Sequence, residues 1–114
     1  MTAHRDPRDD VVVVHRPWGS FAQFVANAPV TVKIITVLPG QRLSLQTHEQ
    51  RGEYWHVIDG PLLVTIDDDR HEAVAGDSLW VPVGAVHRMT NVGDSPARVL
   101  EIAYGQFDED DIVR

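Results

Sequence analysis

Three side chains that can bind a divalent metal stand near one another in the sequence, and a fourth follows further along the chain. Gln46 and His48 are separated by one residue, Glu53 follows shortly, and His87 comes just after the turn Pro82-Val83-Gly84. The chain contains no cysteine, which leaves imidazole, carboxylate, amide and water ligands for a metal. Such a set suits Zn²⁺, Fe²⁺, Mn²⁺ or Ni²⁺, and among these we expect Zn²⁺.

If residues 42–48 form a strand, Gln46 and His48 point to the same face, because side chains alternate along a strand. Glu53 and His87, each at the beginning of a predicted strand, could then close on the same point. Gln46 has two possible roles, since its amide oxygen could bind the metal directly or hold a metal-bound water. The alternative for the whole group is a hydrogen-bonded polar interior without a metal.

The same alternation predicts an inward orientation for Arg42 and Ser44. A guanidinium inside a barrel needs a carboxylate partner or an anionic ligand. Arg42 is therefore a candidate for binding a substrate phosphate; alternatively, it lies at the barrel mouth, solvated or paired with an acid such as Asp59. The other cations considered for the phosphate are Lys33, Arg51 and Arg88.

The remaining sequence predicts a single all-β domain. Short segments rich in β-branched and aromatic residues are separated by turns containing Gly, Pro and Asp, and no stretch carries a sustained 3.6-residue apolar period. Many short strands at nearly regular spacing are typical of a sandwich or a barrel. The predicted strands are residues 11–14, 21–25, 30–38, 42–47, 54–58, 62–66, 72–75, 78–81, 86–91 and 98–103.

The composition of the chain argues against a membrane-spanning protein and against a nucleic-acid-binding protein. A chain of 114 residues with 43% hydrophobic content is expected to form one domain over residues 1–114, with residues 1–10 as a flexible N-terminal segment. The longest apolar run, at residues 11–14, is far below the roughly 20 residues of a spanning helix, and no signal peptide is recognisable. A net charge of −7 argues against a nucleic-acid partner. We expect a cytoplasmic protein without a membrane partner.

The spacing of these residues resembles the two motifs of the cupin superfamily. Nine of the ten positions that the motifs specify agree, and the exception is Gln46 in place of the first histidine. The matching positions are Gly40, His48, Glu53 and Gly60 in the first motif and Gly76, Pro82, Gly84, His87 and Asn91 in the second. The resemblance implies a double-stranded β-helix, the cupin jelly-roll barrel, with a metal in its interior.

Over residues 15–114 the chain also resembles the type II mannose-6-phosphate isomerase cupins. The segments that carry this resemblance include Arg16-Pro17-Trp18-Gly19, residues 39–48, Arg51-Gly52-Glu53-Tyr54-Trp55, residues 81–88 and residues 109–114. Phosphomannose isomerases use a Gln-x-His, Glu, His ligand set, which accounts for Gln46. In bifunctional relatives this cupin follows a guanylyltransferase domain, for which the present chain has no room, so synthesis of a sugar nucleotide is not expected.

The resemblance implies a metal-dependent aldose–ketose isomerase that interconverts mannose 6-phosphate and fructose 6-phosphate in polysaccharide biosynthesis. Arg42 and Lys33 are the catalytic candidates, and the general base is not identified. The predicted substrate-binding residues are Arg42, Ser44, Arg51, Trp55 and Arg88. Two alternatives remain: a non-catalytic cupin that binds a sugar or metabolite, and a dioxygenase-like cupin enzyme with another small substrate. Gln46 favours the isomerase, because iron oxygenases more often supply imidazole at that position.

The apolar run at residues 11–14 would invite pairing if it were exposed at a sheet edge. We expect it to be tucked under the sheet or exchanged with a second subunit. Since cupins commonly dimerise through such sheets, a homodimer is expected.

Overall fold

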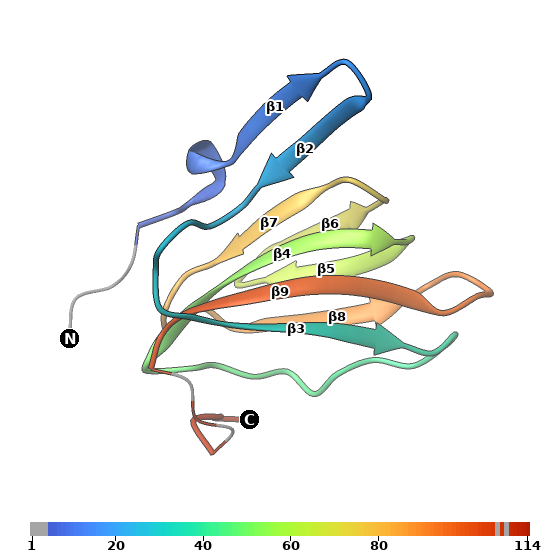
Figure 1. Ribbon diagram of the computed structural model, residues 1–114. Helices are drawn as coiled ribbons and strands as arrows, with labels where there is room; N and C mark the ends of the chain where they lie inside the picture. The colour runs from blue at the N-terminus through green and yellow to red at the C-terminus, as the bar shows by residue number, and fades with distance from the viewer. Residues whose placement is uncertain (1–4, 107, 109) are drawn as a thin grey trace.

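Nine strands and one short 3₁₀ helix form almost all of the regular structure in the computed structural model, which describes residues 5–106, 108 and 110–114 (Figure 1). In chain order the elements are η1 (Arg8–Asp10), β1 (Val12–Arg16), β2 (Gly19–Gln23), β3 (Val30–Val37), β4 (Arg51–Asp59), β5 (Leu62–Ile66), β6 (Asp69–Ala73), β7 (Ser78–Val81), β8 (His87–Asn91) and β9 (Ala97–Gly105). The predicted all-β class is confirmed. No helix in the described part of the chain is long and apolar enough to cross a membrane.

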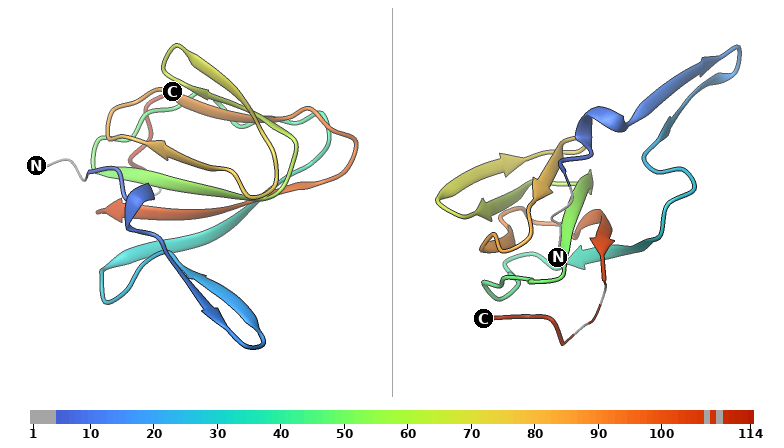
Figure 2. Two further views of the ribbon diagram at one scale, coloured as in Figure 1. Left: turned by 90° about the horizontal axis from the view of Figure 1, so that it is seen from above. Right: turned by 90° about the vertical axis from the view of Figure 1, so that its left-hand side faces the viewer.

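Two antiparallel sheets face each other and enclose the main core (Figure 2). One has four strands in the order β3-β9-β4-β7, and the other has three strands in the order β6-β5-β8. Trp55, Val57 and Val99 of the first sheet pack with Val64 and Met89 of the second, and all five are almost completely buried. The space between the two sheets is where the alternating inward side chains meet.

The four-stranded sheet carries polar groups as well as apolar groups on its inner face. Trp55 on β4 is the register partner of Glu101 on β9, and Glu101 is in turn the partner of Lys33 on β3. Side chains at paired positions lie on the same face of a sheet. Trp55, Glu101 and Lys33 therefore form one row across three adjacent strands, and Glu53 lies on the same face two residues before Trp55.

The strand predicted at residues 42–47 is not formed, and this prediction was wrong. The segment runs beside β8 with isolated bridges, in which Arg42 pairs with Thr90 and Gln46 pairs with His87. Four positions therefore separate the two bridges on the segment and three on β8, so the segment contains one extra residue. An extra residue of this kind is a β-bulge, and it inverts the face on which the following side chains lie.

This inversion corrects the predicted orientation of Arg42. Leu43, not Arg42, packs against the main core, and the Arg42 residue is exposed. Asp59, proposed as its partner, instead accepts a hydrogen bond from Nε of Arg98 at 2.6 Å. Gln46, after the extra residue, does face the interior.

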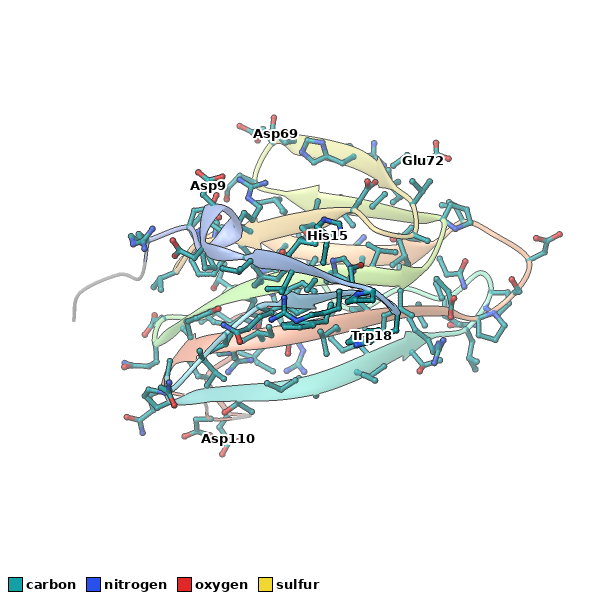
Figure 3. The ribbon with its side chains drawn as sticks, turned by 45° about the horizontal axis from the view of Figure 1, so that its top comes forward. Asp9, His15, Trp18, Asp69, Glu72 and Asp110 are labelled. Carbon is teal, nitrogen blue, oxygen red and sulfur yellow. The ribbon has the colours of Figure 1, made fainter. Side chains whose placement is uncertain are left out.

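The β1–β2 hairpin stands away from the two sheets, as the second view in Figure 2 shows. Val12 is 49% exposed and Val13 is 56% exposed, while Trp18 at the turn of the hairpin lies on the surface (Figure 3). Of the two placements expected for this apolar run, burial under the protein's own sheet holds only in part, because Val11 packs against the core while Val12 and Val13 are exposed. Of the predicted flexible segment, residues 1–4 lie outside the described part, whereas η1 is regular and lies against β7.

Candidate metal centre

His48, Glu53 and His87 converge at one point between the sheets. Nε2 of His48 lies 3.3 Å from Oε2 of Glu53 and 3.0 Å from Nε2 of His87. Nε2 of His87 lies 3.5 Å from Oε1 of Glu53. All three residues are buried, and one potential ligand atom from each lies within 4.8 Å of the others. This group could bind a metal.

The hydrogen bonds of the Nδ1 atoms show which nitrogen of each imidazole carries the proton. Nδ1 of His48 is 2.6 Å from the carbonyl oxygen of Asp111, and Nδ1 of His87 is 3.0 Å from that of Ala85. A carbonyl oxygen only accepts hydrogen bonds, so each Nδ1 carries the proton and each neutral ring has a bare Nε2.

The electrostatics of the site favour these neutral rings. Burial is the main cause that lowers the pKa of both histidines, that of His87 to about 4. The Nε2 lone pairs of His48 and His87 then face each other beside the carboxylate of Glu53. These electron-rich groups repel one another unless a positive charge lies between them. The guanidinium of Arg51 approaches one of them, with Nη2 3.4 Å from Nε2 of His48. The donor set and its orientation fit a divalent cation.

Backbone pairing holds the ligand-bearing segments in place. Gln46 and His87 exchange two backbone hydrogen bonds, of 3.1 and 2.9 Å, which fix the segment before His48 against the start of β8. The backbone N–H of Gly84 donates to the carbonyl oxygen of His48 at 2.9 Å. Gly84 has φ +83°, a left-handed conformation that glycine adopts without strain, so this turn can lead His87 into the site.

The C-terminal residues form a strap beside the site. Thr47 and Val113 exchange two backbone hydrogen bonds, of 2.8 and 3.0 Å. The carboxylate of Asp111 accepts hydrogen bonds from the backbone N–H groups of Glu49 and Gln50, at 3.0 and 2.9 Å. These bonds, with desolvation opposing them, leave the pKa of Asp111 below its usual value. The strap therefore orients His48 through a main-chain carbonyl group.

Arg51 holds the carboxylate of Glu53. It is 3% exposed, and its Nε donates to Oε2 of Glu53 at 3.0 Å while Nη1 donates to the carbonyl oxygen of Asp108 at 2.9 Å. A buried guanidinium and a buried carboxylate of this kind compensate each other's charge. The contacts of Arg51 are thus to the site itself, and its predicted contact with substrate stays a prediction.

A cavity of about 270 Å³ opens beside the three converging groups. It contains most of the residues singled out from the sequence, and Arg42 is not among its described lining residues. The residues from that prediction that do line it are Lys33, Ser44, Gln46, His48, Arg51, Glu53, Trp55, His87 and Arg88. Nε2 of Gln46 donates to Oγ of Ser44 at 3.0 Å, and the role of its amide oxygen as a fourth ligand stays a prediction.

Among the charged residues that line this cavity, sequence reasoning missed two, Glu101 and Arg114. Glu101 is 3% exposed, and burial together with the adjacent charge of Glu53 raises its pKa to about 7. Its position on the same strand face as Val99 and Ala103 was a usable signal, because a lone acid on an apolar face needs a partner. The opposite face, with Leu100 and Ile102, is equally apolar, so alternation alone did not show which face was inside.

The comparisons with known proteins identify the family. A family described as "Mannose-6-phosphate isomerase C-terminal" matches residues 3–114. The chain belongs to this family. Its curated relatives include the alginate biosynthesis protein AlgA of Pseudomonas aeruginosa, 42% identical over 102 residues, and a mannose-1-phosphate guanylyltransferase of Escherichia coli, 41% identical over 102 residues. Each match covers 89% of this chain, which spans only 21% of the length of those relatives.

Solved structures confirm the jelly-roll cupin fold. An oxalate oxidase in complex with glycolate has a TM-score of 0.66 and 25% identity, over 74% of this chain and 45% of that chain. The capsular polysaccharide assembling protein CapF of Staphylococcus aureus has a TM-score of 0.64 and 20% identity, over 90% of this chain and 31% of that chain. The second likeness concerns the fold alone.

Replacement of the converging histidines should remove the metal without unfolding the domain. We expect His48→Ala and His87→Ala each to abolish tight binding of one divalent ion per chain, because each removes one bare Nε2. Metal analysis of purified protein and thermal melting with and without added Zn²⁺ measure this. His71→Ala, at an exposed histidine on β6, is the matched control. Unchanged tight binding in the double His48 and His87 variant would place the ion elsewhere.

The pKa of His87 predicts a pH dependence of stability in the metal-free protein. The folded value of about 4 lies below the unfolded reference of 6.5, so the unfolded chain takes up the proton first as the pH falls. Wild type should therefore lose stability relative to His87→Asn between pH 6.5 and 4, by at most about 3 kcal/mol. Urea unfolding at several pH values measures the difference. A difference that does not change with pH would contradict the neutral, buried ring.

Proposed function

We propose that this chain is a metal-dependent aldose–ketose isomerase of sugar phosphates, with mannose 6-phosphate and fructose 6-phosphate as its substrates and Zn²⁺ as its metal. The observation that carries the proposal is the convergence of His48, Glu53 and His87 on one point of a cavity that also holds several cations. Membership of the mannose-6-phosphate isomerase family supports the substrate. The names of its relatives in alginate and xanthan biosynthesis support a role in polysaccharide biosynthesis.

The charge of the cavity suits a phosphorylated ligand. Its described lining residues include four cations, Lys33, Arg51, Arg88 and Arg114, and two carboxylates, Glu53 and Glu101. Arg51 is bonded to Glu53, and Lys33 lies 3.5 Å from Glu101, so each carboxylate has its own cation. The two remaining arginines can serve an anionic ligand.

Arg88 is the strongest candidate for the phosphate contact. Its Nε is buried and has no hydrogen-bond partner among the described residues. A buried guanidinium nitrogen of this kind costs free energy until an acceptor reaches it, and a phosphate oxygen supplies one. Arg114, whose Nε donates to Oγ of Ser44 at 3.2 Å, lies on the same cavity and can contribute a second positive charge.

Each part of the site has a defined task in the proposed reaction. A divalent cation held by His48, Glu53 and His87, with Gln46 as the predicted fourth ligand, would act as a Lewis acid towards the sugar oxygens. Arg88 and Arg114 anchor the phosphate at the far end of the open-chain sugar, which positions C1 and C2 within the cavity. Trp55 forms an apolar wall and limits the entry of water.

The reaction moves a proton between C1 and C2, and this distinguishes an isomerase from a binding protein. We expect the metal-loaded protein to convert fructose 6-phosphate into mannose 6-phosphate in heavy water, with deuterium appearing at C2. Nuclear magnetic resonance of the sugar measures both the conversion and the label. The chelated protein should be inactive and should recover with metal. Binding of the sugar phosphate without any exchange at C1 or C2 would instead favour the non-catalytic cupin.

Two of the three arginines predicted to bind substrate, Arg88 and Arg42, lie in different places. Arg88→Ala should raise the KM for the sugar phosphate about 10- to 100-fold, because a charge-assisted hydrogen bond contributes roughly 1.5–3 kcal/mol. Arg42→Ala is the matched control, since Arg42 is exposed and lies outside the cavity lining that the structure describes. Steady-state kinetics of both variants make the comparison. An increase in KM for Arg42→Ala alone would show that the phosphate binds outside this cavity.

The remaining predictions are part of the same proposal. We infer a homodimer in which the exposed β1–β2 hairpin packs on a second copy, supported by the exposure of Val12 and Val13. The cytoplasmic location, the sugar phosphate as partner and the absence of nucleic-acid and membrane partners also remain predictions.

A further inference from the structure

Glu101 is a buried carboxylate at the edge of the proposed substrate cavity. Its residue is 3% exposed, in the middle of the row that Trp55, Glu101 and Lys33 form across β4, β9 and β3. The backbone of β9 at Glu101 pairs with Lys33 on β3 and with Trp55 on β4, so the residue is held between two strands. Burial of a carboxylate is costly and calls for a compensating role or partner.

The two oxygens of Glu101 have different surroundings. Oε1 accepts a hydrogen bond from Nε1 of Trp55 at 3.2 Å. Oε2 lies 3.5 Å from Nζ of Lys33 and has no hydrogen-bond partner among the described residues. Trp55 thus orients the carboxylate from one side and Lys33 supplies a positive charge on the other. One oxygen remains able to accept a proton from a molecule in the cavity that Glu101 lines.

The other carboxylate and the two imidazoles of the cavity, which could also accept a proton, are already engaged. Glu53 belongs to the converging metal group and accepts a hydrogen bond from Arg51. The Nδ1 atoms of His48 and His87 face carbonyl oxygens, and their Nε2 atoms face the metal position. Lys33 is a cation beside Glu101 and has no lone pair to offer while it is protonated.

We propose that Glu101 is the catalytic residue that carries the proton between C1 and C2, with Lys33 and Trp55 as the residues that position it. This inference rests on the proposed isomerase function and names the base for it. From the ketose, the Glu101 carboxylate takes a proton from C1, and the C1–H electron pair becomes the C1=C2 double bond. The π electrons of the C2 carbonyl group move to O2, and O2 takes the hydroxyl proton of the neighbouring O1, which leaves a cis-enediolate with its negative charge on O1.

The second half of the reaction returns the proton. The carboxylic acid of Glu101 protonates C2 and the C1=C2 electrons form the new C2–H bond. An electron pair on O1 forms the C1=O double bond of the aldehyde, and O2 keeps the proton that it took from O1. Glu101 ends as the carboxylate with which it began, and no oxidant or reductant is consumed. A single acid–base group on one side of the sugar is sufficient for both transfers.

Replacement of the carboxylate by its neutral isostere tests the assignment. Glu101→Gln should keep its metal content and its binding of fructose 6-phosphate, measured by metal analysis and calorimetry. It should lose deuterium exchange at C1 and conversion to mannose 6-phosphate by about 100- to 10,000-fold in kcat, the usual contribution of general acid–base catalysis. Glu72→Gln on β6, an exposed acid outside this cavity lining, is the matched control and should exchange at the wild-type rate.

A second variant separates catalysis from packing. Glu101→Ala removes the carboxylate and leaves space, and added formate should restore part of the exchange by supplying a small mobile proton acceptor. A purely structural role would not respond to formate.

Each outcome decides the assignment. Exchange by Glu101→Gln within tenfold of wild type would overturn it and leave the isomerase function standing. Loss of metal or of sugar phosphate binding in this variant, or no rescue of Glu101→Ala by formate, would also overturn it. Absence of exchange in the metal-loaded wild type would overturn the proposed function together with its base.

Discussion

The bare Nε2 atoms of His48 and His87 face each other at 3.0 Å beside the carboxylate of Glu53, and the surrounding structure is arranged to keep them there. Such crowded lone pairs are stable only around a positive charge, so the protein must hold each ring against their repulsion. A main-chain carbonyl group fixes each Nδ1, a pair of backbone hydrogen bonds joins Gln46 to His87, and Arg51 secures the carboxylate. The β-bulge, the Gly84 turn and the C-terminal strap position Gln46, His87 and His48 respectively, so that the polar groups meet at one point.

The cavity contains two buried carboxylates, each with its own cation and its own proposed role. Glu53, bonded to Arg51, belongs to the metal group, whereas Glu101, beside Lys33 and hydrogen-bonded to Trp55, lies on the adjacent strand. Burial, together with the nearby charge of Glu53, raises the pKa of Glu101 to about 7. Substrate anchoring, metal binding and proton transfer can thus occupy separate side chains within a cavity of about 270 Å³.

The sequence predicted well those features that depend on local spacing. The convergence of His48, Glu53 and His87 and the alternating strands around them follow from motif spacing, turn residues and period-two patterns. The orientation of Arg42 could not be predicted, because a one-residue bulge inverts the face without any glycine or proline to mark it. Glu101 was missed because both faces of its strand are apolar. The strap acts on His48 through a backbone carbonyl group, and no side-chain pattern encodes that contact.

Anomalous diffraction from crystals grown with Zn²⁺ tests the central claim most directly, because it locates the ion without assuming its ligands. We expect one strong peak per chain at about 2.0–2.2 Å from Nε2 of both histidines and from a carboxylate oxygen of Glu53. A peak away from these three groups, or none at all with the imidazoles still facing each other, would contradict the account.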